Sequence, residues 1–354
     1  MATVTTPQAV SVVRHEAADQ EDIFRFYAET FGQDLTEGSR RRWDWQYTEN
    51  PEREAEGPAI WIAREATDVL GQYASMPVRL FWDGREVRSS WGMDVFLRPQ
   101  ARGKGVGARL FTAWSDHVEV ALGLGLTPSS YGLFKKLRYH DVGPVPFFQK
   151  VMDARAVASR RLGPVLGTIA GPGLGLGWSL RHPERRRASS VTVEPITSFG
   201  PDFDALWERA RASYAMCVRR DAAYLRWKYV LCPHRQYTLH AARRDGELAG
   251  FAVSRQEDYR GLRLGWILDV FADAGDRDAK DALLGAVLDG FRAAGVARAQ
   301  AFAMNAALQD DLRQRGFRAA ASPMQFCVRT RVSEAPLRER GRWHVVFGDS
   351  DMDR

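Results

Sequence analysis

The chain has 354 residues, of which 45% are hydrophobic and 11% aromatic. This length exceeds one ordinary core and this composition is not that of a disordered chain, so we expect a large or double globular fold. The net charge of +6 suits an anionic partner such as a phosphorylated cofactor or lipid head groups. No zinc finger, ribonucleoprotein motif or long basic run supports binding to nucleic acid.

The three cysteines, Cys217, Cys232 and Cys327, are few and widely spaced. They form neither a disulfide framework nor a zinc-binding spacing, so we expect a reducing cytoplasm and no metal site. The first residues lack the basic start and compact apolar centre of a secretory signal peptide.

The first half of the chain alternates segments typical of helices and strands. Trp43, Trp45 and Tyr47 alternate, which fits a half-buried strand or a helical stripe, packed in a core or lining an acceptor pocket. In chain order we expect a helix over 19–31, strands over 59–65, 69–84 and 91–97, a helix after a glycine loop, a helix over 129–137 and a strand over 144–150.

The second half repeats this pattern. "RRWDWQYTENP" in the first half resembles "YLRWKYVLCPH" in the second, and later matches follow in the same order. The repeat unit is roughly 150 residues, far longer than a solenoid repeat, and therefore indicates a tandem duplication. The matched positions are Trp45 and Trp227, Tyr47 and Tyr229, Asp94 and Asp269, and Tyr139 and Phe317.

Strands interleaved with helices predict an α/β class with a mixed sheet in each copy. We place the first copy at 1–152, a Gly/Pro-rich linker at 153–190, the second copy at 191–332, and a terminal strand with an acidic tail at 333–354. Within the linker, 162–180 carries no charge and has basic flanks, but its six glycines and two prolines make a poor helix. We favour a packed linker over a peripheral membrane contact.

The stretch "MDVFLRPQARGKGVGARLF" joins a predicted strand to a predicted helix through a glycine-rich loop. Glycines allow a close backbone approach, and the helix adds its positive end, so such a loop forms an anion site. The residues 106–108 of the first helical turn would lie closest to a pyrophosphate, with charge from Lys104. The spacing matches neither a Walker loop nor a dinucleotide fingerprint.

The residues 102–107 fit the pattern [QR]-x-x-G-x-[GA]. The stretch therefore resembles the coenzyme A loop of the GNAT superfamily of acyl-CoA N-acyltransferases. The resemblance implies two tandem domains, each a mixed, mostly antiparallel sheet flanked by helices. It also implies direct transfer of an acyl group, expected to be acetyl, from acyl-CoA to the amine of a small-molecule acceptor. The implied donor-binding residues are Val95, Phe96, Leu97, Arg102, Gly103, Lys104, Gly105, Val106, Gly107, Ala108, Thr127 and Phe134.

The resemblance is incomplete in the segment after the loop helix. Thr127 stands where the family often has an asparagine that holds the coenzyme. Phe134 stands where a tyrosine often protonates the departing thiolate, so Tyr131, one turn earlier, is the alternative acid, or else a core or surface aromatic. The second copy has acids in "DAGDRDAKDALLG" at its loop position, which predicts that it no longer binds coenzyme A.

Asp94, on the strand before the loop, is the candidate general base, although its counterpart Asp269 in the second copy favours a structural role. The C-terminal residues 343–354 form either a solvated tail or a segment in which His344 or Asp349 takes a proton from the acceptor. Other functions remain open: a non-catalytic acyl-CoA sensor, a membrane-associated long-chain N-acyltransferase, and, less well supported, a Fem-type aminoacyl transferase.

Overall fold

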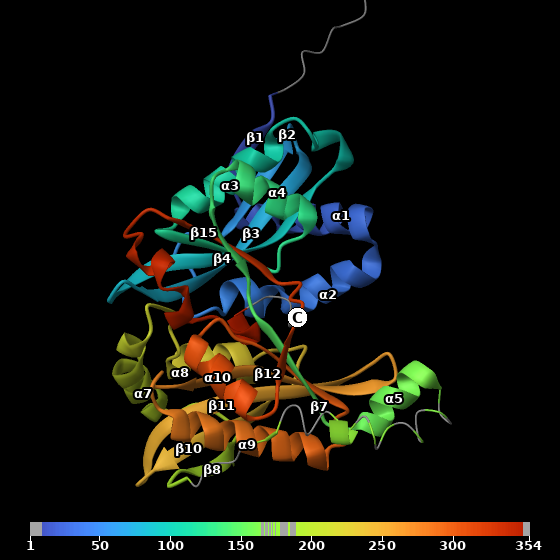
Figure 1. Cartoon of the computed structure of the whole chain (residues 1–354). Coiled ribbons are helices and arrows are strands. Elements are labelled where there is room, and N and C mark those ends of the chain that lie inside the picture. The colour runs from blue at the N-terminus through green and yellow to red at the C-terminus, as the bar shows by residue number, and fades with distance from the viewer. Residues whose placement is uncertain are drawn as a thin grey trace, which may run out of the picture. The chain divides into compact units, whose positions relative to one another are not determined.

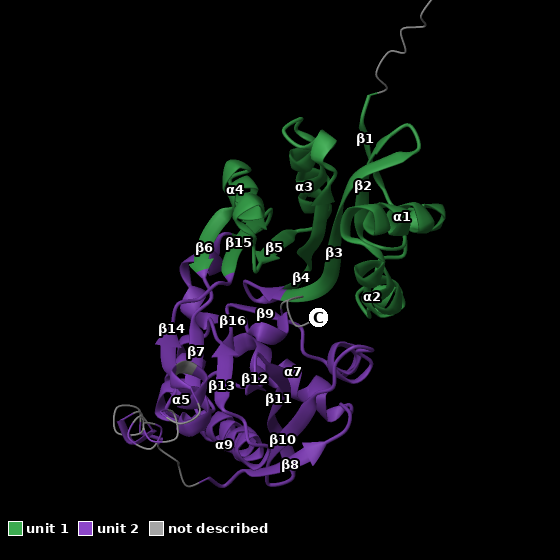
Figure 2. Ribbon diagram, turned by 90° about the vertical axis from the view of Figure 1, so that its right-hand side faces the viewer, with its two compact units in different colours: residues 1–80, 86–143, 325–333 green, residues 81–85, 144–324, 334–354 purple. Residues whose placement is uncertain are grey.

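The computed structural model describes residues 9–163 and 189–349, together with 166, 169, 171, 173, 175–177, 183 and 184. The chain divides into two compact units (Figure 2). Unit 1 combines residues 1–80, 86–143 and 325–333, and unit 2 combines residues 81–85, 144–324 and 334–354.

Unit 1 contains a mixed sheet in the order β1-β2-β3-β4-β5-β15-β6, which can be followed in Figure 2. Figure 1 labels β1, β2, β3, β4 and β15 of this sheet. Its neighbours β4 and β5 are parallel, whereas β1–β2, β2–β3 and β5–β15 are antiparallel. The strands are β1 (Ser11–Arg14), β2 (Ile60–Glu65), β3 (Asp68–Trp82), β4 (Arg85–Leu97), β5 (Val120–Leu124), β15 (Gln325–Thr330) and β6 (His140–Pro144).

The helices of unit 1 are α1 (Gln20–Phe31), α2 (Gln33–Trp43), α3 (Val106–His117) and α4 (Pro128–Lys136). The buried residues of α3 recur at helical spacing, so one face of this helix packs in the core of the unit. There Trp114 stacks on Tyr73 with ring centroids 4.6 Å apart. The core thus fixes α3, and with it the loop that precedes α3.

Unit 2 contains a second mixed sheet in the order β14-β7-β13-β12-β11-β10-β8. Only β12 and β13 are parallel among these neighbours. The strands are β14 (Arg318–Ala320), β7 (Phe147–Val151), β13 (Arg298–Phe302), β12 (Leu262–Ala272), β11 (Glu247–Tyr259), β10 (Thr238–Arg244) and β8 (Thr192–Ile196). β9 (Met216–Val218) and β16 (Trp343–His344), which do not belong to this sheet, pair with each other in parallel. The helices are α5 (Ala154–Leu162), α7 (Asp202–Ala210), α8 (Ala222–Leu225), α9 (Arg277–Ala293) and α10 (Ala306–Gln314).

The two copies exchange their last strands. β7 is the last strand of the first copy in sequence but pairs with β13 in the second sheet. Conversely, β15 is the last strand of the second copy but pairs with β5 in the first sheet. The compact units are therefore discontinuous in sequence, unlike the contiguous boundaries expected at residues 152 and 332.

The aromatic repeat is helical. In the first copy α2 continues into a π-helical turn over Asp44–Thr48, and in the second copy α8 continues into one over Arg226–Val230. Both turns bury their tryptophan and tyrosine side chains. π-helical turns are rare in proteins, and those that occur are often at functional sites. Their occurrence at matched positions therefore supports the duplication.

The three cysteines are buried and unpaired. Among the described residues, no helix is both long and apolar enough to cross a membrane, and no cluster of three or more His, Cys, Asp or Glu side chains could hold a metal ion. Most of 162–180, the segment for which a membrane contact remained open, lies outside the described residues.

Candidate functional site

The loop between β4 and α3 ends in two glycines with left-handed backbone. Gly103 has φ 75° and Gly105 has φ 78°, and a side chain at either position would project into open space. Gly105 is the N-cap of α3 and offers no side chain to bond the first N–H groups of the helix. Those groups have no partner inside the helix, so they stay available to an outside anion.

Positive charge surrounds this helix end. Arg102 and Lys104 are exposed on the loop, and Arg109 lies in the first turns of α3. Residues 98–109 include four cations and no acid. Arg102 donates from Nη2 to the carbonyl of Leu97 at 3.3 Å, which holds one guanidinium near the end of β4. Charge, open glycines and a free helix end thus coincide in one loop.

The strand before the loop pairs with β5 over only part of its length. The parallel register joins Ser89–Trp91 of β4 to Val120–Leu122 of β5, and β4 continues to Leu97. Beyond this register Val95, Phe96 and Leu97 are half-exposed, although the strand is apolar. A partly open apolar strand end leads directly to the glycine loop.

Asp94 lies on this strand in a strained conformation. Its φ is 45°, and the other described non-glycine residues with positive φ all lie in turns. Gln72 holds the strained peptide by donating from Nε2 to the Asp94 carbonyl at 3.1 Å. Such strain persists only where the surroundings enforce it, and it is concentrated at functional sites.

The half-exposed Asp94 carboxylate accepts hydrogen bonds from two buried residues. Gln46 Nε2 lies 3.4 Å and Tyr47 Oη lies 3.3 Å from Oδ2. Both donors come from the π-helical turn after α2. Sequence reasoning missed Gln46 altogether. The repeat did align Tyr47 with Tyr229, which also donates to the matched aspartate, Asp269, at 3.5 Å.

Two further candidate residues, Thr127 and Tyr131, are engaged in hydrogen bonds at α4. Thr127 is the N-cap of this helix and accepts from the Ser130 N–H at 3.2 Å. Tyr131 donates its hydroxyl to Asp141, and this bond raises the pKa of Tyr131 to about 12. The phenol therefore keeps its proton and directs it to Asp141.

Phe134 lies in the core rather than on a cleft surface. It is 1% exposed, and its ring lies 5.0 Å from that of Phe111 and 4.7 Å from that of Tyr139. The ring also covers Gly123 of β5, where an added Cβ would lie 2.3 Å from it. A ring in this position braces α4 against the sheet.

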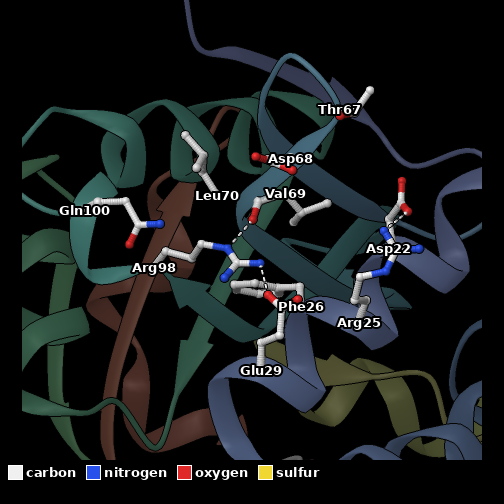
Figure 3. A pocket seen from close by; sticks show the side chains of 10 residues that line it. All are labelled: Asp22, Arg25, Phe26, Glu29, Thr67, Asp68, Val69, Leu70, Arg98 and Gln100. Carbon is white, nitrogen blue, oxygen red and sulfur yellow. Dashed lines mark hydrogen bonds and ion pairs between the residues drawn. The ribbon is translucent and has the colours of Figure 1, made fainter.

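A cavity of about 310 Å³ opens beside the start of the loop, between α1 and the first residues of β3 (Figure 3). Arg98 crosses it, donating to Glu29 and to the Val69 carbonyl. Arg25 pairs with Asp22 at 3.1 Å. These ion pairs join the end of β4 to α1, so the cations of the cavity already have partners.

In the second copy, the loop between β12 and α9 is closed by its own side chains. The Asp276 carboxylate caps α9 by accepting from the Ala279 N–H at 3.0 Å, and it pairs with Arg244 at 2.8 Å. Asp273 accepts from the Gly275 N–H at 2.8 Å, and Ser213 accepts from Ala274. An internal anion therefore occupies the helix end that is open in the first copy.

The C-terminal segment fills the space beyond the β12–β13 register. Val345 accepts from the Met304 N–H at 3.0 Å, Val346 bridges to Ala303, and the Phe347 ring stacks on Trp266 at 4.6 Å. The cavity left between the strands is about 10 Å³, which is at most the size of one water molecule. Residues 343–349 are thus a buried insert rather than a solvated tail.

Asp269 belongs to a fully buried ion network. Arg220 bonds to Asp269 at 3.2 Å and to Asp349 at 2.8 Å, and His344 Nε2 lies 2.9 Å from Asp269. Burial alone would raise the pKa of Asp269, but Arg220 and His344 hold it below its usual range. Burial, and next Arg220, lower the pKa of His344, which favours the neutral ring.

No family model matches the sequence, and no curated protein matches it significantly. Solved structures do match. The GCN5-related N-acetyltransferase of Anabaena variabilis aligns with a TM-score of 0.61 at 13% identity, covering 91% of this chain and 73% of that protein. The N-myristoyltransferase of Saccharomyces cerevisiae with bound myristoyl-CoA aligns with a TM-score of 0.55 at 12% identity, covering 97% and 87%.

The chain has a tandem GNAT fold. Eis1 of Mycobacterium abscessus supports the same conclusion, with a TM-score of 0.53 at 13% identity over 91% of this chain and 73% of that protein. The expected α/β class, with two mixed and mostly antiparallel sheets, is thereby confirmed. At these identities the likeness concerns the fold, and the chemistry must be argued from the residues.

Proposed function

We propose that this protein is an acyl-CoA-dependent N-acyltransferase whose first copy binds the donor, expected to be acetyl-CoA. The observation that carries the proposal is the open N-terminus of α3. Gly103 and Gly105 leave it uncovered, and Arg102 and Lys104 charge it positively. The fold neighbours support an acyl-CoA donor, because one of them, an N-myristoyltransferase, is seen with bound myristoyl-CoA.

The loop and the strand before it could contact different parts of an acyl-CoA donor. N–H groups of residues 105–108 would hold a pyrophosphate, with Lys104 adding a charge-assisted contact. The half-exposed segment Val95–Leu97 would lie along the pantetheine and acyl chain. A backbone N–H of this segment would polarise the thioester carbonyl where negative charge develops.

In this proposal Asp94 takes the proton of the attacking amine, directly or through a water molecule. Tyr47 and Gln46 orient the Asp94 carboxylate, and Gln72 holds its backbone. The new amide bond forms as the bond from carbonyl carbon to sulfur breaks, and the thiolate leaves. Since Phe134 is buried and Tyr131 is bonded to Asp141, solvent water is the proposed proton source for the thiolate.

Calorimetric titration of the full chain with acetyl-CoA tests the donor site. We expect one site per chain, and we expect Gly105→Glu to abolish it by placing a carboxylate against the pyrophosphate. Gly246→Glu is the matched control, since Gly246 also has left-handed backbone, φ 83°, and open space around it, but lies in a hairpin turn. Normal binding by Gly105→Glu would show that the loop is not the donor site.

Turnover separates the enzyme from its main rival, a non-catalytic acyl-CoA sensor. A thiol-release assay with acetyl-CoA and a panel of primary amines should show amine-dependent release by the wild type and none by Gly105→Glu. Binding of acetyl-CoA without amine-dependent release would favour the sensor instead.

A further inference from the structure

We propose that the acceptor carries its amine on an aromatic or aliphatic body, which packs on Phe31 and Phe96 while the amine meets Asp94. This inference rests on the proposed function and adds the substrate class. It follows from an exposed apolar corner that lies next to the candidate base.

The corner is formed where α1 ends and α2 begins. Phe31, the last residue of α1, is 37% exposed, and Leu35 in the first turns of α2 is 63% exposed. Among the described residues of unit 1, the only other large apolar side chain exposed to this degree is Val13 on β1. Two of these three side chains therefore lie close together in sequence, at the junction of α1 and α2, and we take them as the apolar part of the proposed acceptor site.

Ring contacts connect this corner to the strand that carries Asp94. The Phe31 ring lies 4.5 Å from that of Phe96, and the Tyr27 ring lies 5.8 Å from the same Phe96 ring. Phe96 is half-exposed and stands two residues after Asp94 on β4.

Hydrogen bonds make a second connection. Gln72 donates from its side-chain amide both to the Tyr27 hydroxyl and to the Asp94 carbonyl. Gln72 thus connects the aromatic wall, which consists of Tyr27, Phe31 and Phe96, to the strained backbone of Asp94. In this proposal a ligand that contacts Phe31 and Phe96 also reaches the Asp94 carboxylate, which belongs to the same strand two residues before Phe96.

Charge and apolar surface together select the acceptor. An ammonium group is attracted to a carboxylate and to aromatic faces, whereas its apolar body gains from covering the exposed rings. Polycations are less suited, because four of the acids on α1 and α2 already pair with arginines. These pairs are Glu21 with Arg40, Asp22 with Arg25, Glu29 with Arg98 and Glu37 with Arg40.

The cavity of Figure 3 is the competing location for the acceptor. Its lining is mostly polar and its arginines are paired, so it offers little to an apolar body. Asp68 lies on its rim and is exposed. Asp68→Asn therefore serves as the matched control for Asp94→Asn.

The test compares amines that share a head group. With the full-length protein and saturating acetyl-CoA, we expect kcat/KM for phenethylamine to exceed that for ethanolamine and for spermidine at least about 10-fold. Asp94→Asn should slow all three amines at least about 10-fold, and Asp68→Asn should slow none. A preference for spermidine or ethanolamine, or loss of activity in Asp68→Asn alone, would overturn the proposal.

Phe31→Ser tests the wall itself. It should lower kcat/KM for phenethylamine about 10-fold, mostly through KM, and leave ethanolamine unchanged. Val13→Ser, at the exposed apolar position that lies on β1 of the same unit, is the matched control and should change neither. Equal losses for both amines in Phe31→Ser would contradict a specific contact.

Failure of the proposed function has a different signature, namely absence of acetyl-CoA binding or of thiol release. If acetyl-CoA binds without turnover, calorimetric titration of the acetyl-CoA complex with phenethylamine decides the inference. Tighter binding than of ethanolamine, lost in Phe31→Ser, would support it. Equal or absent binding of the two amines would overturn it.

Discussion

The β4–α3 loop and the β12–α9 loop occupy matched positions in two copies of one fold, but they treat an anion in opposite ways. The first ends at Gly105, which leaves the end of its helix open, and carries cations. The second ends at Asp276, whose carboxylate caps its helix and pairs with Arg244. If the first loop binds a phosphate as we propose, the second loop has lost this capacity because the chain supplies its own anion there.

The regions beyond the short parallel registers, between β4 and β5 and between β12 and β13, differ in the same way. β4 runs beyond its register with β5 as a half-exposed apolar end, whereas the matched region beyond the β12–β13 register holds Val345, Val346 and Phe347. Gly348 allows this insertion, because a Cβ there would lie 2.1 Å from Tyr229 Oη. The C-terminal segment thus fills, in the second copy, the place that we propose for the donor in the first copy.

The matched aspartates provide the largest test of this comparison. Asp269→Asn should lower the free energy of unfolding by about 3 kcal/mol or more, because it leaves Arg220 undercompensated in a fully buried network. Asp94→Asn should cost less than about 1 kcal/mol, since Asp94 is half-exposed, its hydrogen bonds are long, and Asn tolerates positive φ. Urea denaturation of both variants measures the difference. Equal costs would mean that Asp94 is as structural as Asp269.

The helix caps provide a smaller effect. Asp276→Ala should cost about 1 kcal/mol by removing the N-cap of α9, close to the cost of Thr127→Ala at the N-cap of α4. We also expect no second acetyl-CoA site in Asp276→Ala, because the C-terminal segment still fills the region beyond the β12–β13 register. Thermal unfolding and calorimetric titration check both parts. Two sites per chain would show that the carboxylate alone excludes the donor.

The sequence predicted the loop and the duplication because both depend on local residue types. Left-handed glycines, neighbouring cations and a helix start are encoded in adjacent positions, and the structure has them as expected. The helix predicted over 19–31 and the strands over 59–65 and 91–97 are confirmed within a few residues or as parts of longer strands.

Long-range partners could not be predicted in this way. Nothing local reveals that β7 and β15 pair in the opposite sheets, or that Gln46 and Gln72 converge on Asp94. The burial of the C-terminal residues also depends on a distant partner. Alternating aspartates suggest a solvated tail, yet Asp349 is buried because Arg220, far away in sequence, compensates its charge.

The last expected effect is on the pH dependence of stability. The pKa of His344 is lowered by burial and by Arg220, so the unfolded chain binds more protons as pH falls below about 6.5. The stability contribution of the neutral ring is therefore complete above that pH and is lost towards lower pH, by at most about 1.4 kcal/mol per pH unit. His344 Nδ1 has no hydrogen-bond partner in the described part of the chain, so protonation would bury an unpaired N–H.

His344→Gln isolates this effect, because its amide can still donate to Asp269 but cannot titrate in this range. We expect the drop in melting temperature between pH 7.5 and pH 5.5 to be smaller in His344→Gln than in the wild type. Part of the drop should remain, because burial also lowers the pKa of His15 and of His240. His140→Gln, at an exposed histidine, should keep the wild-type drop. An unchanged drop in His344→Gln would mean that the buried network of the second copy tolerates a charged ring, and that its contrast with the open Asp94 site is one of packing rather than of charge.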